Sequence, residues 1–101
     1  MRVLMKVTMP HAKFNAAIKD GTASARMQRI LGAQKPEAAY FTEFGGKRTG
    51  ILIVDLAEPA QIPALAEPWF LQFEADVEIH PVMTVEDLGK SNLDAVGRSW
   101  A

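Results

Sequence analysis

The chain has 101 residues, which is enough for one domain of ordinary size but not for two independent cores. Its formal net charge is −1, and both signs are scattered along the chain, which argues against a nucleic-acid or anionic-membrane partner. Cysteine is absent, which excludes disulfide scaffolds, thiolate metal sites and cysteine nucleophiles.

The N-terminal third predicts a strand followed by a broken helix. Residues 2–9 are rich in strand-forming side chains and are followed by a proline, which cannot donate to a strand ladder. Apolar residues then recur every three or four positions, as on the buried face of a helix. This stripe changes phase near Thr22, so we expect a break there, with Thr22 as the N-cap of the second part. Gly32 and the Lys35-Pro36 pair predict the end of the helix.

Two strand-like runs follow, at 38–44 and 49–56. They are joined by two glycines and by Lys47-Arg48, and glycines tolerate the positive φ that tight turns require. The pattern predicts a hairpin with Lys47 and Arg48 at its solvent-exposed tip, although Arg48 could reach a partner subunit. Residues 51–54 are apolar on both faces, which is typical of a central strand buried above and below.

The strongest helical pattern lies between Pro59 and Phe73. Pro68 lies inside it and removes a backbone donor, so we expect a short helix with a kink at that residue. Residues 75–83 alternate as a last strand should. Residues 84–101 predict a helical tail that opens with a capping-box pattern and ends near a tryptophan, which we expect to dock on another surface.

The order strand, helix, hairpin, helix, strand is typical of the ferredoxin-like βαββαβ fold of the α+β class, with a four-stranded antiparallel sheet. Right-handed crossovers place the first and third strands in the centre and both helices on one face. We therefore expect one domain over residues 1–101, with 84–101 as its tail. Side chains with the parity of Val3 suit the helix-covered face, whereas the other face mixes polar groups with Leu4 and Tyr40. That exposed apolar surface predicts a homodimer in which each copy covers the open face of the other.

Three blocks of sequence carry a family resemblance: KPEAAYFTE at 35–43, RTGILI at 48–53 and IPALAEPWF at 62–70. They resemble a group of short bacterial and fungal proteins of the dimeric α+β barrel superfamily. Some members are labelled pantothenate synthetase, but that enzyme is a much larger nucleotide-binding ligase whose phosphate-binding histidine motif is absent here. Residues 68–79 more distantly resemble the second helix and last strand of muconolactone isomerase and of small cofactor-free monooxygenases. The resemblance implies a homo-oligomer with a pocket between the helices and the open sheet face, but no particular reaction.

His80 and Lys6 are the candidate catalytic residues. Strand alternation places both on the open face, where an imidazole could act as a general base and a partly desolvated lysine could bind an anion or polarise a carbonyl. The alternative for His80 is a ring held by Glu78 or by the backbone. The alternative for Lys6 is an ion pair with Glu78 or Glu43, or a side chain extended toward the rim.

Four further residues are candidates for substrate binding. Tyr40 and Thr42 supply hydroxyl groups to the open face, with packing at a subunit interface as the alternative. Glu78 lies two residues before His80 on the same face of the strand. Trp69 lies beside the expected kink and could line the cavity. The alternative is that it packs in the hydrophobic core, as aromatic residues at helical spacing usually do.

The sequence therefore predicts a homodimeric small-molecule-binding protein that acts on a small anionic or carbonyl-bearing metabolite. If it is an enzyme, we expect proton transfer, as in an isomerase or cyclase, with His80 as base and Lys6 as its electrostatic partner. The alternatives are a cofactor-free oxygenase on the same scaffold and a non-catalytic dimer that binds a partner. Two histidines without the spacing of a metal site predict no metal, and no cofactor is expected. No apolar run reaches membrane-spanning length and no secretory leader is expected, so the predicted location is the cytoplasm.

Overall fold

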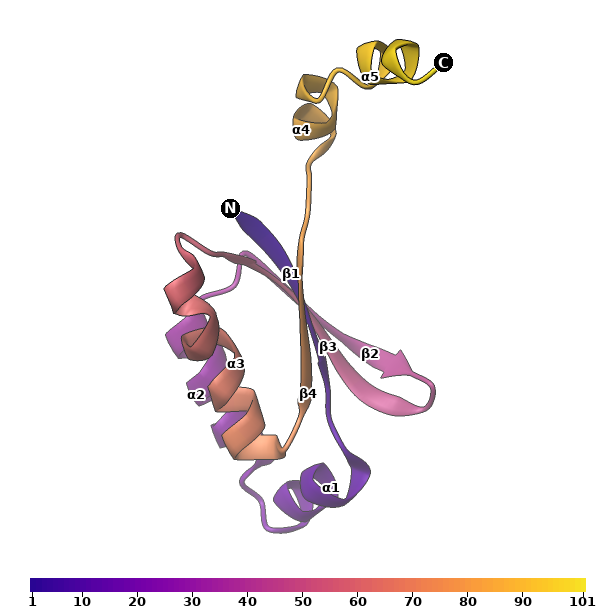
Figure 1. The fold of residues 1–101 in the computed structure, drawn as a ribbon. Helices are drawn as coiled ribbons and strands as arrows, with labels where there is room; N and C mark the ends of the chain where they lie inside the picture. Colours follow the sequence, from indigo (N-terminus) through magenta and orange to yellow (C-terminus); the bar gives the residue numbers. More distant parts are fainter.

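The chain folds into one antiparallel sheet with helices against one of its faces. The structure is a computed structural model that describes residues 1–101. The strands lie in the order β2-β3-β1-β4, which confirms the ferredoxin-like α+β fold and the central position of the first and third strands. The strands are β1 (Arg2–Thr8), β2 (Ala38–Phe44), β3 (Lys47–Asp55) and β4 (Asp76–Pro81), and the helices of this part are α1 (His11–Lys19), α2 (Ala23–Gln34), the 3-10 turn η1 (Pro59–Gln61) and α3 (Ile62–Phe73). Figure 1 shows α2 and α3 side by side against the sheet, and α1 at the end of the sheet where β1 finishes.

The hydrophobic core lies between the sheet and these helices. Its largest fully buried side chains include Trp69, Phe73, Met5, Met9 and Leu52. The rings of Trp69 and Phe73 are 6.2 Å apart between centroids, a distance typical of favourable aromatic pairs. Alternate residues of β1 point into this core, as a strand with one covered face requires.

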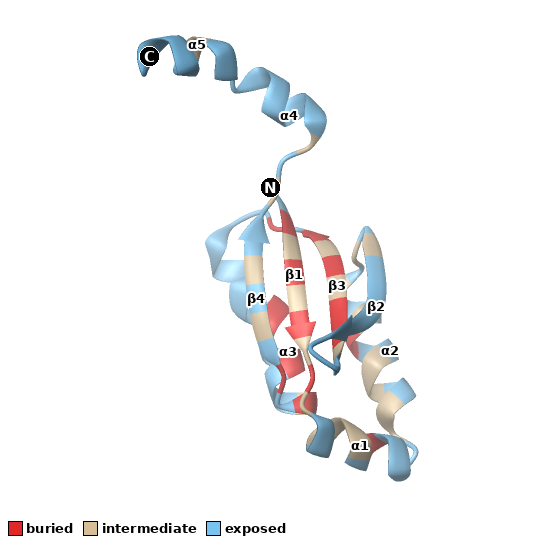
Figure 2. Cartoon of the chain, turned by 90° about the vertical axis from the view of Figure 1, so that its right-hand side faces the viewer, coloured by how far each residue is buried: buried red, intermediate tan, exposed pale blue.

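The alternation of β3 assigns its side chains to the two faces of the sheet. Leu52 and Val54 are buried on the helix side, whereas Ile51 and Ile53 are only half-buried on the open side. Figure 2 shows the same alternation along β1 and β3. The strand is central, as predicted, but only one of its faces is covered within the single chain.

The first helical region breaks where the sequence predicts, but its ends are made differently. Thr22 occupies the N-cap position of α2, yet its Oγ1 donates to Oδ1 of Asp20 at 2.6 Å instead of accepting from the helix. This bond and the one from the Thr22 N–H hold the pKa of Asp20 below its ordinary value. Of the two expected stop signals, Gly32 is wrong and Lys35-Pro36 is confirmed, because α2 continues to Gln34 and ends at Lys35, which adopts the left-handed conformation with φ 47°.

The hairpin between β2 and β3 is tighter than predicted. Its turn consists of Gly45 and Gly46 alone, with φ of 58° and 79°, as a two-residue turn with positive φ at both central positions requires. Lys47 and Arg48 are therefore not loop residues. They pair with Phe44 and Glu43, and β3 begins two residues earlier than expected.

Helix α3 runs unbroken through Pro68 for 12 residues, so the expectation of a short helix is wrong. Proline has no N–H to donate to the carbonyl of Ala64, four residues earlier. Gln34 of α2 supplies the missing donor, since its Nε2 lies 3.3 Å from that carbonyl oxygen and 2.8 Å from the carbonyl of Leu65. Its Oε1 accepts from Nε1 of the buried Trp69 at 3.2 Å. One glutamine side chain therefore joins α2 to α3 and permits a proline inside the helix.

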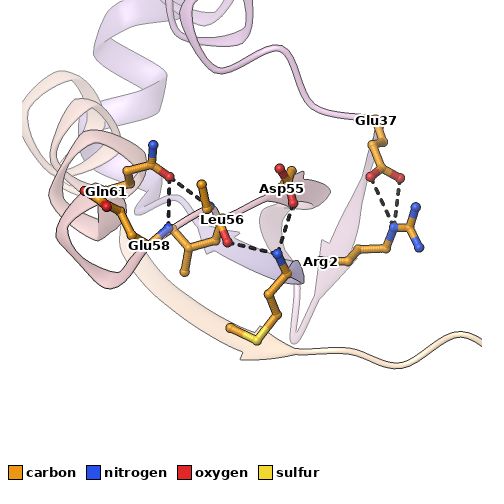
Figure 3. Close-up of polar contacts among 8 residues, drawn as sticks. Arg2, Glu37, Asp55, Leu56, Glu58 and Gln61 are labelled. Carbon is orange, nitrogen blue, oxygen red and sulfur yellow. Dashed lines mark hydrogen bonds and ion pairs between the residues drawn. The ribbon is translucent and has the colours of Figure 1, made fainter. Parts of the chain in front are cut away.

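Polar contacts fix the end of the sheet from which the tail leaves. The N-terminal ammonium of Met1 lies 3.2 Å from Oδ1 of Asp55, and Nε of Arg2 donates to both carboxylate oxygens of Glu37 at 3.1 and 2.9 Å (Figure 3). The hydrogen bond to Glu37 raises the pKa of Arg2. The N–H of Val82 donates to the carbonyl of Arg2 at 3.2 Å, so the chain enters the tail beside this end of β1.

The tail contains two short helices, α4 (Val85–Lys90) and α5 (Leu93–Ser99). The predicted capping box is confirmed: Oγ1 of Thr84 accepts from the N–H of Asp87, and Oδ2 of Asp87 accepts from the N–H of Thr84, each at 3.1 Å. Figure 1 shows both helices projecting beyond the sheet. Trp100 is 86% exposed, so the expectation that it docks is not met within the single chain.

Candidate functional site

The open face carries most of the sequence-predicted site residues. In the register of the sheet, Lys6 pairs with Glu78 on one side and with Ile51 on the other, and Ile51 pairs with Tyr40. These four residues form one row across the sheet. His80 lies in the next row, opposite Leu4 on β1.

Glu78 connects the two candidate catalytic residues. Its Oε1 lies 3.3 Å from Nε2 of His80, and its Oε2 lies 3.8 Å from Nζ of Lys6. The Lys6 ammonium also lies 4.8 Å from the ring centroid of Phe44, within cation–π range. A carboxylate that orients an imidazole is a common arrangement for a general base. The side chains of His80 and Glu78 are 58% and 53% exposed, so water reaches the group freely in the single chain.

Tyr40 does not join this group. It is 67% exposed and lies two strands from Lys6, which is about 10 Å at the usual strand spacing. Thr42 lies further toward the hairpin, opposite Thr49. The structure therefore brings His80, Glu78 and Lys6 together, but it leaves both hydroxyl residues apart from them.

Trp69 lies on the other side of the sheet. It is fully buried in the core, and its indole N–H donates to Gln34. A ligand on the open face is separated from it by the sheet itself. The sequence left two roles open for Trp69, the wall of a cavity and the hydrophobic core, and in the structure it lies in the core.

A pocket of about 400 Å³ opens on the helix side, between α1, α2 and the β2–β3 hairpin. Its volume falls within the range of about 300–1,000 Å³ that small-molecule sites occupy. Four of the residues around it are apolar, and the other three are two threonines and Arg48. The hydroxyl group of Thr49 donates to the carbonyl of Lys47 at 3.0 Å. The lining residues are Met9, Phe14, Met27, Phe41, Thr42, Arg48 and Thr49. Thr42 is the one sequence-predicted site residue among them.

Arg48 is the charged group of this pocket. Its guanidinium carbon lies 4.9 Å from the ring centroid of Phe14, and its Nη1 is buried without a hydrogen-bond partner. None of the ion pairs of the chain involves it. Glu43, which faces it across the hairpin, accepts instead from the N–H of Gly46 at 2.8 Å. A buried cationic donor without an acceptor is unfavourable.

Gly50 makes room for the wall of this pocket. A Cβ at this position would lie 3.1 Å from Cε1 of Phe41, closer than ordinary packing allows. The glycine therefore lets the Phe41 ring lie over β3, where it borders the pocket. Any larger residue would push the ring away from the strand.

The placement of Arg48 at an exposed tip is wrong. The sequence nevertheless contains a pattern that could have found it: Arg48, Gly50, Leu52 and Val54 share one parity, and the last two are core residues. Extending the strand back by two residues puts the arginine on the helix-covered face. A charged residue on a covered face indicates either an ion pair or a ligand, and the chain offers no ion pair.

Residues 4–95 match the family model described as Domain of unknown function (DUF3303). The chain belongs to the DUF3303 family. A comparison with the curated proteins finds no match. None of the helices in this DUF3303 protein combines the length and the apolar character needed to cross a membrane.

Proposed function

We propose that this DUF3303 protein binds a small anionic metabolite with an apolar body, in the pocket beside Arg48. The observation that carries the proposal is that Arg48 lines a pocket with mostly apolar walls, while its guanidinium forms no ion pair and its buried Nη1 has no hydrogen-bond partner. An arginine fork recognises a carboxylate through two parallel hydrogen bonds, which a lysine cannot reproduce. Phe14 and Phe41 offer aromatic surface to the remainder of the ligand. Aromatic and keto acids of modest size fit this combination.

We further propose that the protein is a homodimer, as the resemblance to the dimeric α+β barrel proteins implies. The open face supports this, because Leu4, Ile51 and Ile53 are only half-buried and Tyr40 is largely exposed. Apolar surface of this kind, gathered on one sheet face, marks an interaction site. A second copy would cover it symmetrically.

A second candidate function is proton transfer at His80. The observation in its favour is the chain of contacts from Lys6 through Glu78 to His80, at 3.8 and 3.3 Å. In a homodimer the covering copy would exclude water from these groups and strengthen their electrostatic effect. His80→Ala should then abolish isomerase or cyclase turnover of a substrate held on the open face, a site separate from the Arg48 pocket. The oxygenase alternative predicts turnover that requires oxygen, and the non-catalytic dimer predicts none.

Thermal unfolding with and without added acids tests the binding proposal. We expect benzoate and phenylpyruvate at millimolar concentration to raise the melting temperature of the wild-type protein, and benzamide, which has no charge, to leave it unchanged. Arg48→Met should remove the effect. Lys47→Met is the matched control, since Lys47 is the adjacent residue and is exposed. Equal shifts for Arg48→Met and the wild-type protein would overturn the proposal.

A further inference from the structure

The tail is built as a folded element, yet nothing within the chain covers it. Its first helix begins at a complete capping box, and its second follows Asn92, which adopts the left-handed conformation with φ 54°. Neither helix contains a buried residue. Helices of six and seven residues are far shorter than the roughly 12–15 residues that give marginal stability in water. Their stability must therefore come from packing against another surface.

The apolar side chains of the tail, which we call its apolar stripe, come from both helices. Val85 and Leu88 are three residues apart on α4, Leu93 and Val96 are three residues apart on α5, and Trp100 follows at the C-cap of α5. All five side chains are more than 40% exposed. A hollow of about 340 Å³ lies between the helices and is lined in part by the first three of these residues. The tail thus offers exposed apolar side chains around a hollow that Gly89, Asn92 and Asp94 also line.

The exposed area of the chain identifies the kind of partner. A compact protein of 11.1 kDa exposes about 5,650 Å². This chain exposes 6831 Å², which is roughly 1,200 Å² more than that compact reference. Stable dimers bury about 800 Å² from each partner, and obligate homodimers bury more. The excess is therefore of the size that one subunit of a homodimer buries.

The shape of the chain leads to the same conclusion. Its radius of gyration is 16.9 Å, against about 12.7 Å for a compact chain of this length. The difference comes from the tail, which Figures 1 and 2 show extending away from the sheet and helices. Two unpartnered apolar surfaces, the tail and the open sheet face, belong to one chain. A two-fold symmetric pair of chains covers both surfaces of both copies at once.

We infer that the tail, residues 84–101, reaches across to a second copy of the chain and packs its apolar stripe on that copy's open sheet face. This rests on the homodimer proposed above and specifies how it closes. Trp100 supplies the largest apolar side chain of the contact. The half-buried Leu4, Ile51 and Ile53, together with the exposed Tyr40, supply the receiving surface.

Disulfide trapping tests this directly, because the chain has no cysteine of its own. One preparation carries Val96→Cys and another carries Tyr40→Cys, and the two are mixed and oxidised. We expect a cross-linked heterodimer in high yield. Arg98→Cys is the matched control on the opposite, polar side of the same helix, and its yield should be several-fold lower. A Tyr40→Cys, Val96→Cys double variant that forms its disulfide within one chain would overturn the inference, because the tail would then fold back on its own sheet.

Sedimentation separates failure of this inference from failure of the homodimer. Trp100→Ala should raise the dimer dissociation constant at least about ten-fold, as truncation of a buried aromatic anchor does. A wild-type dimer unaffected by Trp100→Ala, with no cross-link through Val96→Cys, would overturn the role of the tail and leave the dimer standing. A wild-type chain that stays monomeric at 100 µM would overturn both.

Discussion

Replacing Arg48 should make the unliganded protein more stable, although Arg48 is half-buried. Its buried Nη1 has no acceptor, which costs about 1–3 kcal/mol. Its contact with the Phe14 ring at 4.9 Å returns about 0.5–1 kcal/mol. Arg48→Met removes the unpaired donor and keeps an aliphatic stem, whose sulfur offers about 0.3–1.5 kcal/mol against the ring. Because Arg48 is only half-buried, we take the penalty for the unpaired donor at its lower end of about 1 kcal/mol; the two ring contacts nearly cancel, and the balance is a gain of about 1 kcal/mol in the free energy of unfolding.

Urea denaturation in the absence of any acid measures this gain. For a domain of about 100 residues the slope is near 1–1.5 kcal/mol per molar urea, so the midpoint of Arg48→Met should rise by about 0.7–1 M. The melting temperature should rise by about 4–8 °C. Lys47→Met, an exposed neighbour, should change the free energy by less than about 0.5 kcal/mol.

The opposite result would refute the reasoning. If Arg48→Met lowers the midpoint by a similar amount, the guanidinium is a structural group that finds its acceptor in the folded chain. The pocket would then have no unsatisfied charge to offer a ligand. A more stable variant that no longer responds to benzoate would instead show the trade between stability and binding that functional sites display.

Three further predictions concern the fold. Gln34→Ala leaves a buried indole N–H unpaired and removes the donor that replaces the missing bond at Pro68. Urea denaturation should therefore show a loss of about 2 kcal/mol in the free energy of unfolding. In the Pro68→Ala background, where the helix bond is restored, the same substitution should cost about 1 kcal/mol less. Thr22→Val should raise the pKa of Asp20 in an NMR titration, because the hydroxyl that donates to the Asp20 carboxylate is removed. A lowered carboxyl pKa stabilises the fold at pH values above the unfolded pKa, and this stabilisation disappears as the pH falls through the folded pKa. The variant should therefore lose less stability on acidification than the wild-type protein. Gly46→Ala should lower the free energy of unfolding by about 1 kcal/mol, because φ is 79° there. An unchanged Asp20 titration, additive effects at positions 34 and 68, or a neutral Gly46→Ala would each contradict its own prediction.

The architecture could be predicted because local patterns and topology rules agree. Element order and right-handed crossovers suffice for the strand order β2-β3-β1-β4. Alternation in β1 separates the buried Val3 from the open-face Lys6 without any knowledge of the partner strands. The capping box at Thr84 is a purely local feature, and it begins a helix even though that helix has nothing to pack on within the chain.

The exceptions all depend on residues distant in the sequence. Helix α3 passes Pro68 because Gln34, 34 residues earlier, donates to the orphaned carbonyl, and no pattern within the helix reveals this. Arg48 joins β3 because it pairs with Glu43 across a two-residue turn. The two glycines alone are compatible both with a loop of four residues, 45–48, and with a turn of two residues, Gly45 and Gly46. That choice of two residues decides whether the arginine points to water or into a pocket.

The β2–β3 hairpin carries both proposed surfaces, on opposite sides. Phe41 and Arg48 line the pocket beneath the helices, whereas Tyr40 and Phe44 have the opposite parity and lie on the open face. Side chains of adjacent residues on a strand do not touch, so the two surfaces can be altered independently. Arg48→Met should therefore abolish acid binding and leave the dimer dissociation constant unchanged, and Trp100→Ala should do the reverse. If both properties change together in either variant, the hairpin moves as one body and transmits ligand binding to the subunit contact.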